Sequence, residues 1–298
     1  MSEEGRDIRM DEKHLPGFYH DAEEVAGRGQ RRTMLFSRVR LIGAVGAAVG
    51  GAFKWKIGGG NVDIWAWVAL GGFLIALFGE LLLWVMHPEL KWNAGRTVAE
   101  RVKSLAWRYA VGGDPFSGTG QDPRKDLDLA IADAVKEHRK TVLLTTTNDL
   151  GDQALAELRT KPFADRKTVY REHRVQQQLG WYRGKAAMNE TRANVFRVLL
   201  ILGELVAIVF AVLRLLGTWD VDMSGVMAAA VAAGAAWIGL RQYENLRVAY
   251  ATAAGELADI YQRLPYVTED EWPAAVAETE AVISNEHTAW MASRPSAA

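Results

Sequence analysis

The stretch IWAWVALGGFLIALFGELLLWVM, Ile64 to Met86, sets the class of this protein, because it holds one charged residue, Glu80, in an otherwise uncharged and mostly apolar run. A helix of about 20 apolar residues crosses the hydrocarbon core of a bilayer, so this run is long enough to span a membrane. Three further apolar runs occur in the chain. Together they predict spans at about residues 36–55, 64–86, 197–216 and 223–240.

The first of these spans has the shortest apolar run. Its uncharged part, LIGAVGAAVGGAF from Leu41 to Phe53, reaches the thickness of a bilayer only if Leu35, Phe36 and Trp55 extend it at the interfaces. The fourth, Met223 to Leu240, carries no charge. We therefore expect four spans, of which the first crosses fully only with the help of its flanks.

The average composition hides this segregation of apolar residues. The chain has 298 residues, a mean hydropathy of −0.06 and a formal net charge of −1. The absence of a basic surplus gives no reason to expect nucleic acid as a partner. The chain has no cysteine, which excludes disulfides, thiolate metal sites and cysteine nucleophiles. The charged first residues, MSEEGRDIRMDEKHLPG, do not resemble a cleavable signal peptide.

The loops within the two predicted hairpins are short, 54–63 and about 217–222, so both termini and the long central stretch should lie on one side of the membrane. Positively charged loops favour the cytoplasmic side. Five arginines precede the uncharged run of the first span: Arg28, Arg31, Arg32, Arg38 and Arg40. The second loop instead contains Asp220 and Asp222, although the first loop contains two lysines. We therefore expect both termini and the long central stretch to face the cytoplasm.

The two halves of the chain have the same plan, which indicates a duplicated unit. We divide the chain into a first unit, 14–111, a linker with connecting helices, 112–161, and a second unit, 162–292. Each hairpin is followed by an amphipathic stripe at helical spacing, and 164–216 is predicted to be one nearly continuous helix. The glycine- and proline-rich stretch 112–124 is predicted to be an exposed linker. The fold class is all-α: a polytopic membrane protein with two transmembrane hairpins and long amphipathic cytoplasmic helices.

Several stretches resemble a known family. The segment LRTKPFADRKTVYREHRVQQQLGWYRGKAAMNE, the hairpin behind it, LRVAYATAAGEL and the terminal EHTAW are similar to the SLATT group, the SMODS- and SLOG-associating two-transmembrane effector domains. The first hairpin and WNAGRTVAERVKSLAWRYAVGGDPF resemble a second member of the same group. The resemblance implies a tandem protein that acts as a bacterial conflict-system effector on the inner membrane. It also implies a nucleotide-signalling enzyme or sensor protein as a partner.

Two glutamates interrupt the apolar spans, each directly after a glycine. Glu80 lies six residues before Met86, the end of its span, and Glu204 lies six residues after Val198, where the apolar run of its own span begins, so both should lie about 9 Å below the same surface. A charged side chain facing lipid at the bilayer centre costs roughly 2.5 to 3.5 kcal/mol. The two glutamates are therefore candidates for lining or gating a cation path in an oligomer. Alternatively, each reaches the headgroups, is protonated, or bonds a neighbouring helix.

Small residues in the first and fourth spans recur at four-residue intervals and predict close helix packing, although such patterns also arise by chance. The stripes are Gly43, Ala47 and Gly51; Gly46 and Gly50; and Ala228, Ala232 and Ala236.

The basic and aromatic segment from Arg166 to Arg192 is a candidate cytoplasmic interaction surface. Its candidate residues, with one from the C-terminal stripe, are Arg174, Trp181, Tyr182 and Trp290. The segment could contact a partner, a nucleotide or anionic headgroups. Alternatively, its aromatic residues pack on another helix of the bundle and its arginines face solvent.

No pattern of catalytic or metal-binding residues stands out. The six histidines are scattered, and neither HExxH nor a phosphate-binding glycine loop occurs. The paired acids Asp126 and Asp128, and Glu278 and Glu280, are expected on solvated helical faces. We therefore expect no enzyme activity, no cofactor and no metal. The predicted function is an oligomeric effector that forms a pore or perturbs the lipid bilayer; the alternative is a non-conducting membrane scaffold that recruits a cytosolic partner.

Overall fold

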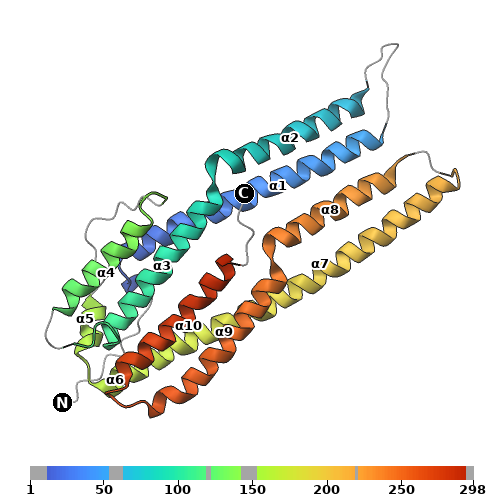
Figure 1. The fold of residues 1–298 in the computed structure, drawn as a ribbon. Helices are drawn as coiled ribbons and strands as arrows, with labels where there is room; N and C mark the ends of the chain where they lie inside the picture. Colours follow the sequence, from blue (N-terminus) through green and yellow to red (C-terminus); the bar gives the residue numbers. More distant parts are fainter. Residues whose placement is uncertain (1–11, 54–62, 119–121, 142–152, 219–220, 293–298) are drawn as a thin grey trace, which may run out of the picture. The chain divides into compact units, whose positions relative to one another are not determined.

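The computed structural model describes residues 12–53, 63–118, 122–141, 153–218 and 221–292, with side chains up to residue 284. Within these ranges every regular element is a helix (Figure 1), which confirms the all-α class. In chain order the elements are η1 (Glu12–His14), α1 (Gly17–Ala52), α2 (Ile64–Met86), α3 (Pro88–Val111), α4 (Pro123–Glu137), α5 (Gln153–Thr160), α6 (Phe163–Val169), η2 (Tyr170–Gln176), α7 (Gln177–Leu215), α8 (Met223–Arg241), α9 (Tyr243–Arg263), η3 (Leu264–Tyr266) and α10 (Trp272–Ala292).

Four helices are long and apolar enough to cross a membrane, as predicted. They are Gly17–Ala52, Ile64–Met86, Phe163–Leu215 and Met223–Tyr266. The third confirms the long continuous helix, in which α6, the π-helical turn η2 and α7 follow one another without a break. The chain packs into two compact units. We call residues 29–89 and 188–244 the membrane unit, and the described residues within 12–28, 90–187 and 245–292 the bundle unit.

The second helix of each hairpin begins and ends in the same way. An aspartate caps its start: Asp63 accepts a hydrogen bond from the amide of Trp65 at 3.0 Å, and Asp222 accepts one from Gly225 at 3.1 Å. A residue with left-handed backbone ends it, His87 after α2 and Gln242 after α8, with φ of 40° and 50°. Because this conformation cannot continue a helix, α2 and α8 end there.

The helices of the first hairpin, α1 and α2, approach each other through glycines. A Cβ atom on Gly43 would lie 2.6 Å from the amide nitrogen of Ala76, and one on Gly50 or Gly72 would collide with the opposite backbone. The packed stripe of α1 is therefore Gly43, Ala47 and Gly50, since a Cβ on Gly46 or Gly51 would meet nothing within 4 Å. The predicted stripes are therefore only partly right: Gly43 and Ala47 pack as predicted, but with Gly50 in place of Gly51, because the contact face follows a three-and-four spacing.

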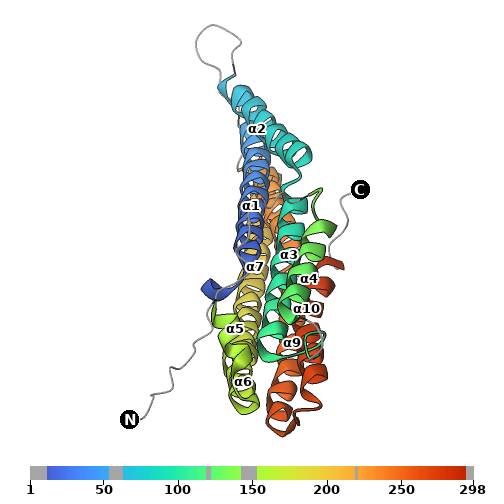
Figure 2. The same ribbon diagram turned by 90° about the vertical axis from the view of Figure 1, so that its left-hand side faces the viewer.

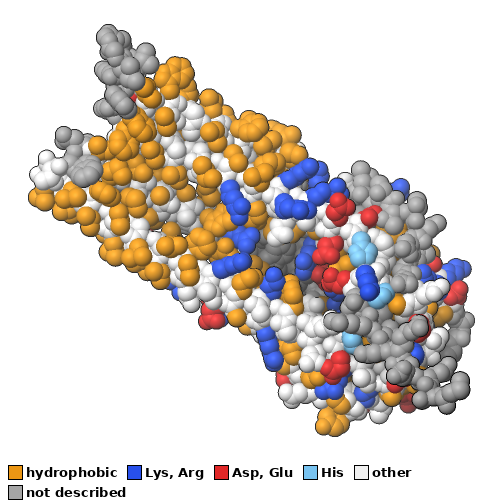
Figure 3. All heavy atoms as spheres, turned by 180° about the vertical axis from the view of Figure 1, so that it is seen from behind, with side chains coloured by type: hydrophobic (Ala, Val, Ile, Leu, Met, Phe, Trp, Pro, Cys, Tyr) orange, Lys and Arg blue, Asp and Glu red, His pale blue; other side chains and the backbone are white. Residues whose placement is uncertain are grey.

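The second hairpin, α7 and α8, packs side chains onto glycines instead of backbone onto backbone. Val231 lies over Gly203, and Leu200 lies over Gly234. Ala228, Ala232 and Ala236 are exposed, so the alanine stripe predicted for this span does not pack within the hairpin. Most apolar side chains of α7 face outward, and Figure 3 shows the resulting hydrophobic surface of the membrane unit.

The bundle unit contains the main hydrophobic core, built by the amphipathic stripes that the sequence indicates. In both ribbon views α9 lies beside α10, and α3 beside α4 (Figures 1 and 2). Leu257 of α9, Val276 of α10 and Val102 of α3 are completely buried. The core therefore draws on both halves of the sequence, and neither half supplies it alone.

The stretch after α3 is only in part the exposed linker that its composition predicts, because Ser117 and Gly118 are exposed but several residues before them are buried. Gly112 and Gly113 are buried, and Phe116 is only 1 % exposed. Arg159 of α5 donates to the carbonyl oxygens of Tyr109 and Phe116, the latter at 2.6 Å. The glycines are present because the chain turns in a crowded place: Gly112 has a φ of 74°, and a Cβ on Gly113 would collide with Val276.

Candidate functional site

Glu80 forms an ion pair between the two helices of the first hairpin. Its Oε2 lies 2.6 Å from Nη1 of Arg40 on α1, and both side chains are partly exposed. The preceding Gly79 explains the spacing, because a Cβ there would lie 2.9 Å from the amide nitrogen of Arg40. Without a side chain at residue 79, α1 comes close enough for Glu80 to reach its partner. The charge of Glu80 is thus balanced within its own hairpin.

Glu204 has no such partner. It is exposed on α7, and among the described residues no hydrogen bond or ion pair reaches it. The neighbouring Gly203 faces Val231 of α8, and Leu202 and Leu205 are each more than half exposed. A carboxylate therefore lies on the apolar outer surface of the membrane unit with no compensating charge. The two glutamates share a sequence pattern, but the structure gives them different surroundings.

A buried ion pair lies in the bundle unit, outside the spans, between the π-helical turn η2 and α10. Arg174 donates from Nε and Nη2 to the two carboxylate oxygens of Glu280, at 2.9 and 2.7 Å. Tyr170 donates its hydroxyl to the same carboxylate at 3.0 Å. Arg174 is 3 % exposed, and the other two residues are fully buried. Such a bidentate, charge-assisted contact fixes the relative position of two helices.

Burial and charge shift two pKa values in this network. Burial, followed by the negative charge of Glu280, raises the pKa of the Tyr170 hydroxyl well above its usual value of 10.0. Burial alone would lower the pKa of Arg174, but the carboxylate of Glu280 outweighs it and the net shift is upward. Tyr170 therefore keeps its proton and Arg174 its charge at neutral pH.

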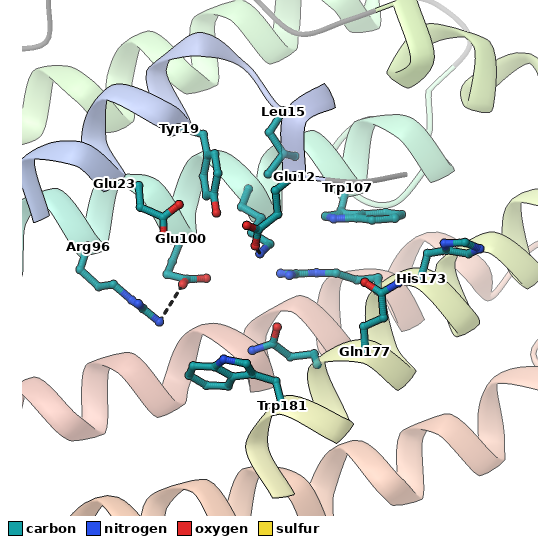
Figure 4. Close-up of a pocket in the computed structure, with 13 residues that line it drawn as sticks. Glu12, Leu15, Tyr19, Glu23, Arg96, Glu100, Trp107, His173, Gln177 and Trp181 are labelled. Atoms are coloured by element: carbon teal, nitrogen blue, oxygen red, sulfur yellow. Dashed lines mark hydrogen bonds and ion pairs between the residues drawn. The ribbon is translucent and has the colours of Figure 1, made fainter. Parts of the chain in front are cut away.

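Arg174 also lines a pocket of about 230 Å3 in the bundle unit (Figure 4). Glu280 accepts one N–H from each of Nε and Nη2, so Nη1 of the guanidinium makes no contact with this carboxylate. The lining comes from η1, α1, α3, η2 and α7, and comprises Glu12, Leu15, Tyr19, Glu23, Arg96, Glu100, Lys103, Trp107, His173, Arg174, Gln177, Gln178 and Trp181. The π-helical turn thus supplies residues to both the pocket and the buried ion pair, in keeping with the frequent occurrence of such turns at functional sites.

Four charged residues of the pocket lining form two ion pairs with one another. Lys103 lies 2.6 Å from Glu12, and Arg96 lies 3.0 Å from Glu100. Burial would raise the pKa of Glu12, but its hydrogen bond to Lys103 and the charge of that residue lower it. The Nδ1 atom of His173 is buried, and no described residue forms a hydrogen bond with it. The lining suits a small polar molecule with a flat apolar face, and no group of three potential metal ligands occurs among the described residues.

Two of the aromatic candidates pack against α9. The hydroxyl of Tyr182 donates to the carbonyl of Ile283 at 3.1 Å, and its ring stacks on Tyr250 with centroids 5.8 Å apart. Trp181 meets the same Tyr250 ring edge-on and carries Lys185 over its face. Tyr182 is thus a core residue, whereas Trp181 is at the border of the core and the pocket. Trp290 belongs to α10, but its side chain lies outside the described residues.

The prediction for Glu280 is wrong: its pairing with Glu278 predicts a solvated face, but Glu280 is fully buried and only Glu278 is exposed. A signal was present in the sequence, because Glu280 lies four residues after Val276 and three before Ile283, on the apolar stripe of the same helix. The pocket residues Glu12, Lys103 and Trp107 gave no comparable signal.

Comparison with known protein families gives two adjacent matches. The model of SMODS and SLOG-associating 2TM effector domain 3 matches residues 16–167, about half of the chain. The model of SMODS and SLOG-associating 2TM effector domain 1 matches residues 170–290. The border between the matches coincides with the start of the π-helical turn η2. No curated protein and no solved structure matches the chain.

Proposed function

Because the chain belongs to the SMODS- and SLOG-associating two-transmembrane effector family, with two such domains in tandem, we propose that it oligomerises in the bacterial inner membrane and opens a pore or perturbs the bilayer. Domains of this family are effectors associated with conflict and antiphage systems. The trigger in this proposal is a signal from an associated nucleotide-signalling enzyme or sensor protein. No catalytic step is part of the proposed function.

The observation that carries the proposal is the unpaired carboxylate of Glu204 on the apolar surface of α7. An ionised carboxylate in contact with acyl chains is unfavourable, so this side chain requires water or a polar group from another molecule. A second copy of the chain that covers α7 would provide either a polar group or a water-filled path beside Glu204. Around a closed oligomer, Glu204 would form an acidic ring that favours cations. Glu80 contributes less to such a ring, because Arg40 neutralises it.

The bundle unit is the proposed receiver of the signal. In the proposed topology it lies in the cytoplasm with both termini, on the side of the arginine-rich segment before the first span. The helix from Phe163 to Leu215 links the pocket-lining turn η2 to the third span without a break. A partner that displaces this helix in the bundle unit would therefore also change its packing in the membrane.

Ion conductance of the purified full-length protein in planar bilayers tests the proposal. We expect cation-selective current, and we expect Glu204→Gln to shift the reversal potential toward that of an unselective pore. Glu190→Gln is the matched control, because Glu190 is also exposed on α7 but precedes the apolar run. If Glu204→Gln conducts with the same selectivity as wild type, Glu204 does not line the ion path. No current with any trigger would favour the membrane scaffold.

A further inference from the structure

Two arginines of the membrane unit lie against the same tryptophan, and neither has an acidic partner in the part of the chain that the structure describes. The guanidinium carbon of Arg38 on α1 lies 5.2 Å from the ring centroid of Trp237 on α8, and that of Arg241 lies 5.8 Å from it. Neither arginine forms an ion pair with a described residue, whereas Arg40, on the same helix as Arg38, is paired with Glu80. Two positive charges are therefore held together without a counterion.

The contacts of Arg241 orient it but do not neutralise it. Its Nε donates to the hydroxyl of Tyr243 at 3.3 Å, and its Nη1 approaches the sulfur of Met34 at 3.4 Å. Tyr243 is 4 % exposed and stacks on Phe196, with ring centroids 5.5 Å apart. Because the tyrosine hydroxyl accepts from Arg241, its own proton remains available to a further acceptor. The site therefore has a rigid aromatic base and several unsatisfied donors.

The depth of the two arginines matches the headgroup region of a bilayer. Arg38 lies three residues before the apolar run that begins at Leu41, and Arg241 follows directly after Leu240. At about 1.5 Å per residue, both lie within roughly 5 Å of the ends of their spans. On the face shown in Figure 3, Lys and Arg side chains gather where the hydrophobic surface ends. Tryptophan is also enriched at this level of membrane proteins.

We propose that Arg38, Trp237 and Arg241 bind the headgroup phosphate of an anionic phospholipid. The two guanidinium groups supply the charge and the fork-shaped donors that suit a phosphate. Trp237 lies against both guanidinium groups, and its partly exposed side chain would contact the glycerol and upper acyl chain. The adjoining apolar surface of the spans favours a lipid over a free phosphate ion, since a lipid fills both the charged and the apolar part. This inference requires membrane insertion only, and it does not depend on pore formation.

The test compares phosphatidylglycerol with phosphatidylcholine as ligands of the full-length protein in detergent micelles, by native mass spectrometry. We expect wild type to retain phosphatidylglycerol preferentially and the double variant Arg38→Gln/Arg241→Gln to bind it about tenfold more weakly or worse, given roughly 1 kcal/mol per basic residue near a lipid surface. The control is Arg32→Gln/Arg192→Gln, which removes two exposed arginines of the same unit that do not contact Trp237. If both double variants lost phosphatidylglycerol binding equally, the overall charge of the protein would explain the loss, and the proposal would be overturned.

Two further arms make the result decisive. Inorganic phosphate at millimolar concentration should not displace the lipid. If phosphate displaces it, the site binds soluble anions and the lipid assignment is wrong.

Should the double variant fail to fold, brominated lipids provide the test by quenching tryptophan fluorescence. Brominated phosphatidylglycerol should quench wild type more than brominated phosphatidylcholine does, and Trp237→Phe should abolish the difference. Equal quenching by both lipids would refute the proposal.

Discussion

Gly79 and Gly203 precede the two membrane glutamates, and the residues that they contact differ. Gly79 lets the backbone of α1 approach, which brings Arg40 within 2.6 Å of Glu80. Gly203 accommodates the side chain of Val231, which offers nothing to Glu204. The same Gly-Glu dipeptide therefore gives an ion-paired glutamate in the first hairpin and, among the described residues, a glutamate without an ion pair in the second. The difference depends on the facing helix and not on the glycine itself.

At Gln242 the chain adopts a left-handed conformation that costs a residue with a side chain about 1–2 kcal/mol. We expect Gln242→Gly to leave stability unchanged or raise it slightly, and Gln242→Val to lower it by about 1–2 kcal/mol, because a β-branched residue is strained there. The thermal midpoint in detergent measures both. Gln262, which is exposed within α9, is the control position. There Gln262→Gly should lower the free energy of unfolding by about 1 kcal/mol relative to Gln262→Ala. If glycine lowered stability at both positions, the expected strain at Gln242 would be contradicted.

Tyr170 should make stability depend on pH in the alkaline range. Its pKa is raised in the folded protein by burial and by Glu280, so the folded state keeps a proton that the unfolded state loses above pH 10. The free energy of unfolding should therefore be flat below pH 10 and fall above it, by about 1.4 kcal/mol per pH unit for this residue. Unfolding measured between pH 8 and 11 tests this.

The control for this pH dependence is a second tyrosine. Tyr170→Phe should reduce the alkaline slope, and Tyr266→Phe should leave it unchanged because Tyr266 is 86 % exposed. An identical slope in wild type and Tyr170→Phe would show that the buried hydroxyl does not carry the effect.

At the scale of elements, the first hairpin is held by backbone contact through small residues. Gly72→Ala should destabilise it by about 1–3 kcal/mol, because the new Cβ collides with the backbone of Ala47. Gly71→Ala is the matched control, since a Cβ there meets nothing within 4 Å. Thermal unfolding in detergent should separate the two variants by several degrees. Equal midpoints would mean that α1 and α2 do not pack as closely as the structure indicates.

At the scale of the whole molecule, the absence of cysteine makes cross-linking a clean test of assembly. If copies meet through α7, Glu204→Cys should form disulfide-linked dimers in membranes under mild oxidation. Ile75→Cys, on the exposed face of α2, should cross-link much more slowly. Dimers that form equally fast from both variants would reflect random collision. No dimers from Glu204→Cys would argue against an α7 interface.

The proposed topology can be tested by labelling whole cells with a membrane-impermeant maleimide. Thr218→Cys, at the end of the second hairpin, should react from outside the inner membrane. Gly118→Cys, exposed in the bundle unit, should react only after the membrane is broken. Labelling of Gly118→Cys in intact cells would reverse the orientation inferred from the arginines before the first span.

The candidate site was predictable only in part. Arg174 and Trp181 were singled out from composition, and both line the pocket. Glu280 was assigned to solvent, although its spacing within the stripe of α10 indicates burial. Lys103 and Glu12 lie 91 residues apart in the sequence, and their ion pair could not be inferred from either segment. A helical period shows which residues share a face, but not which face meets another helix.

The amino-acid sequence alone determined the number of spans, the helical class, the family and the amphipathic stripes. These properties depend on run length and on a period of 3.6 residues, both of which are local. Only the tertiary structure decided that Arg40 pairs with Glu80, that Glu280 is buried, and that the packed glycines of α1 are Gly43 and Gly50. Each of these depends on the rotation of one helix about its axis relative to a neighbour. A rotation is set by packing between segments that lie 40 or more than 100 residues apart, and no local pattern specifies it.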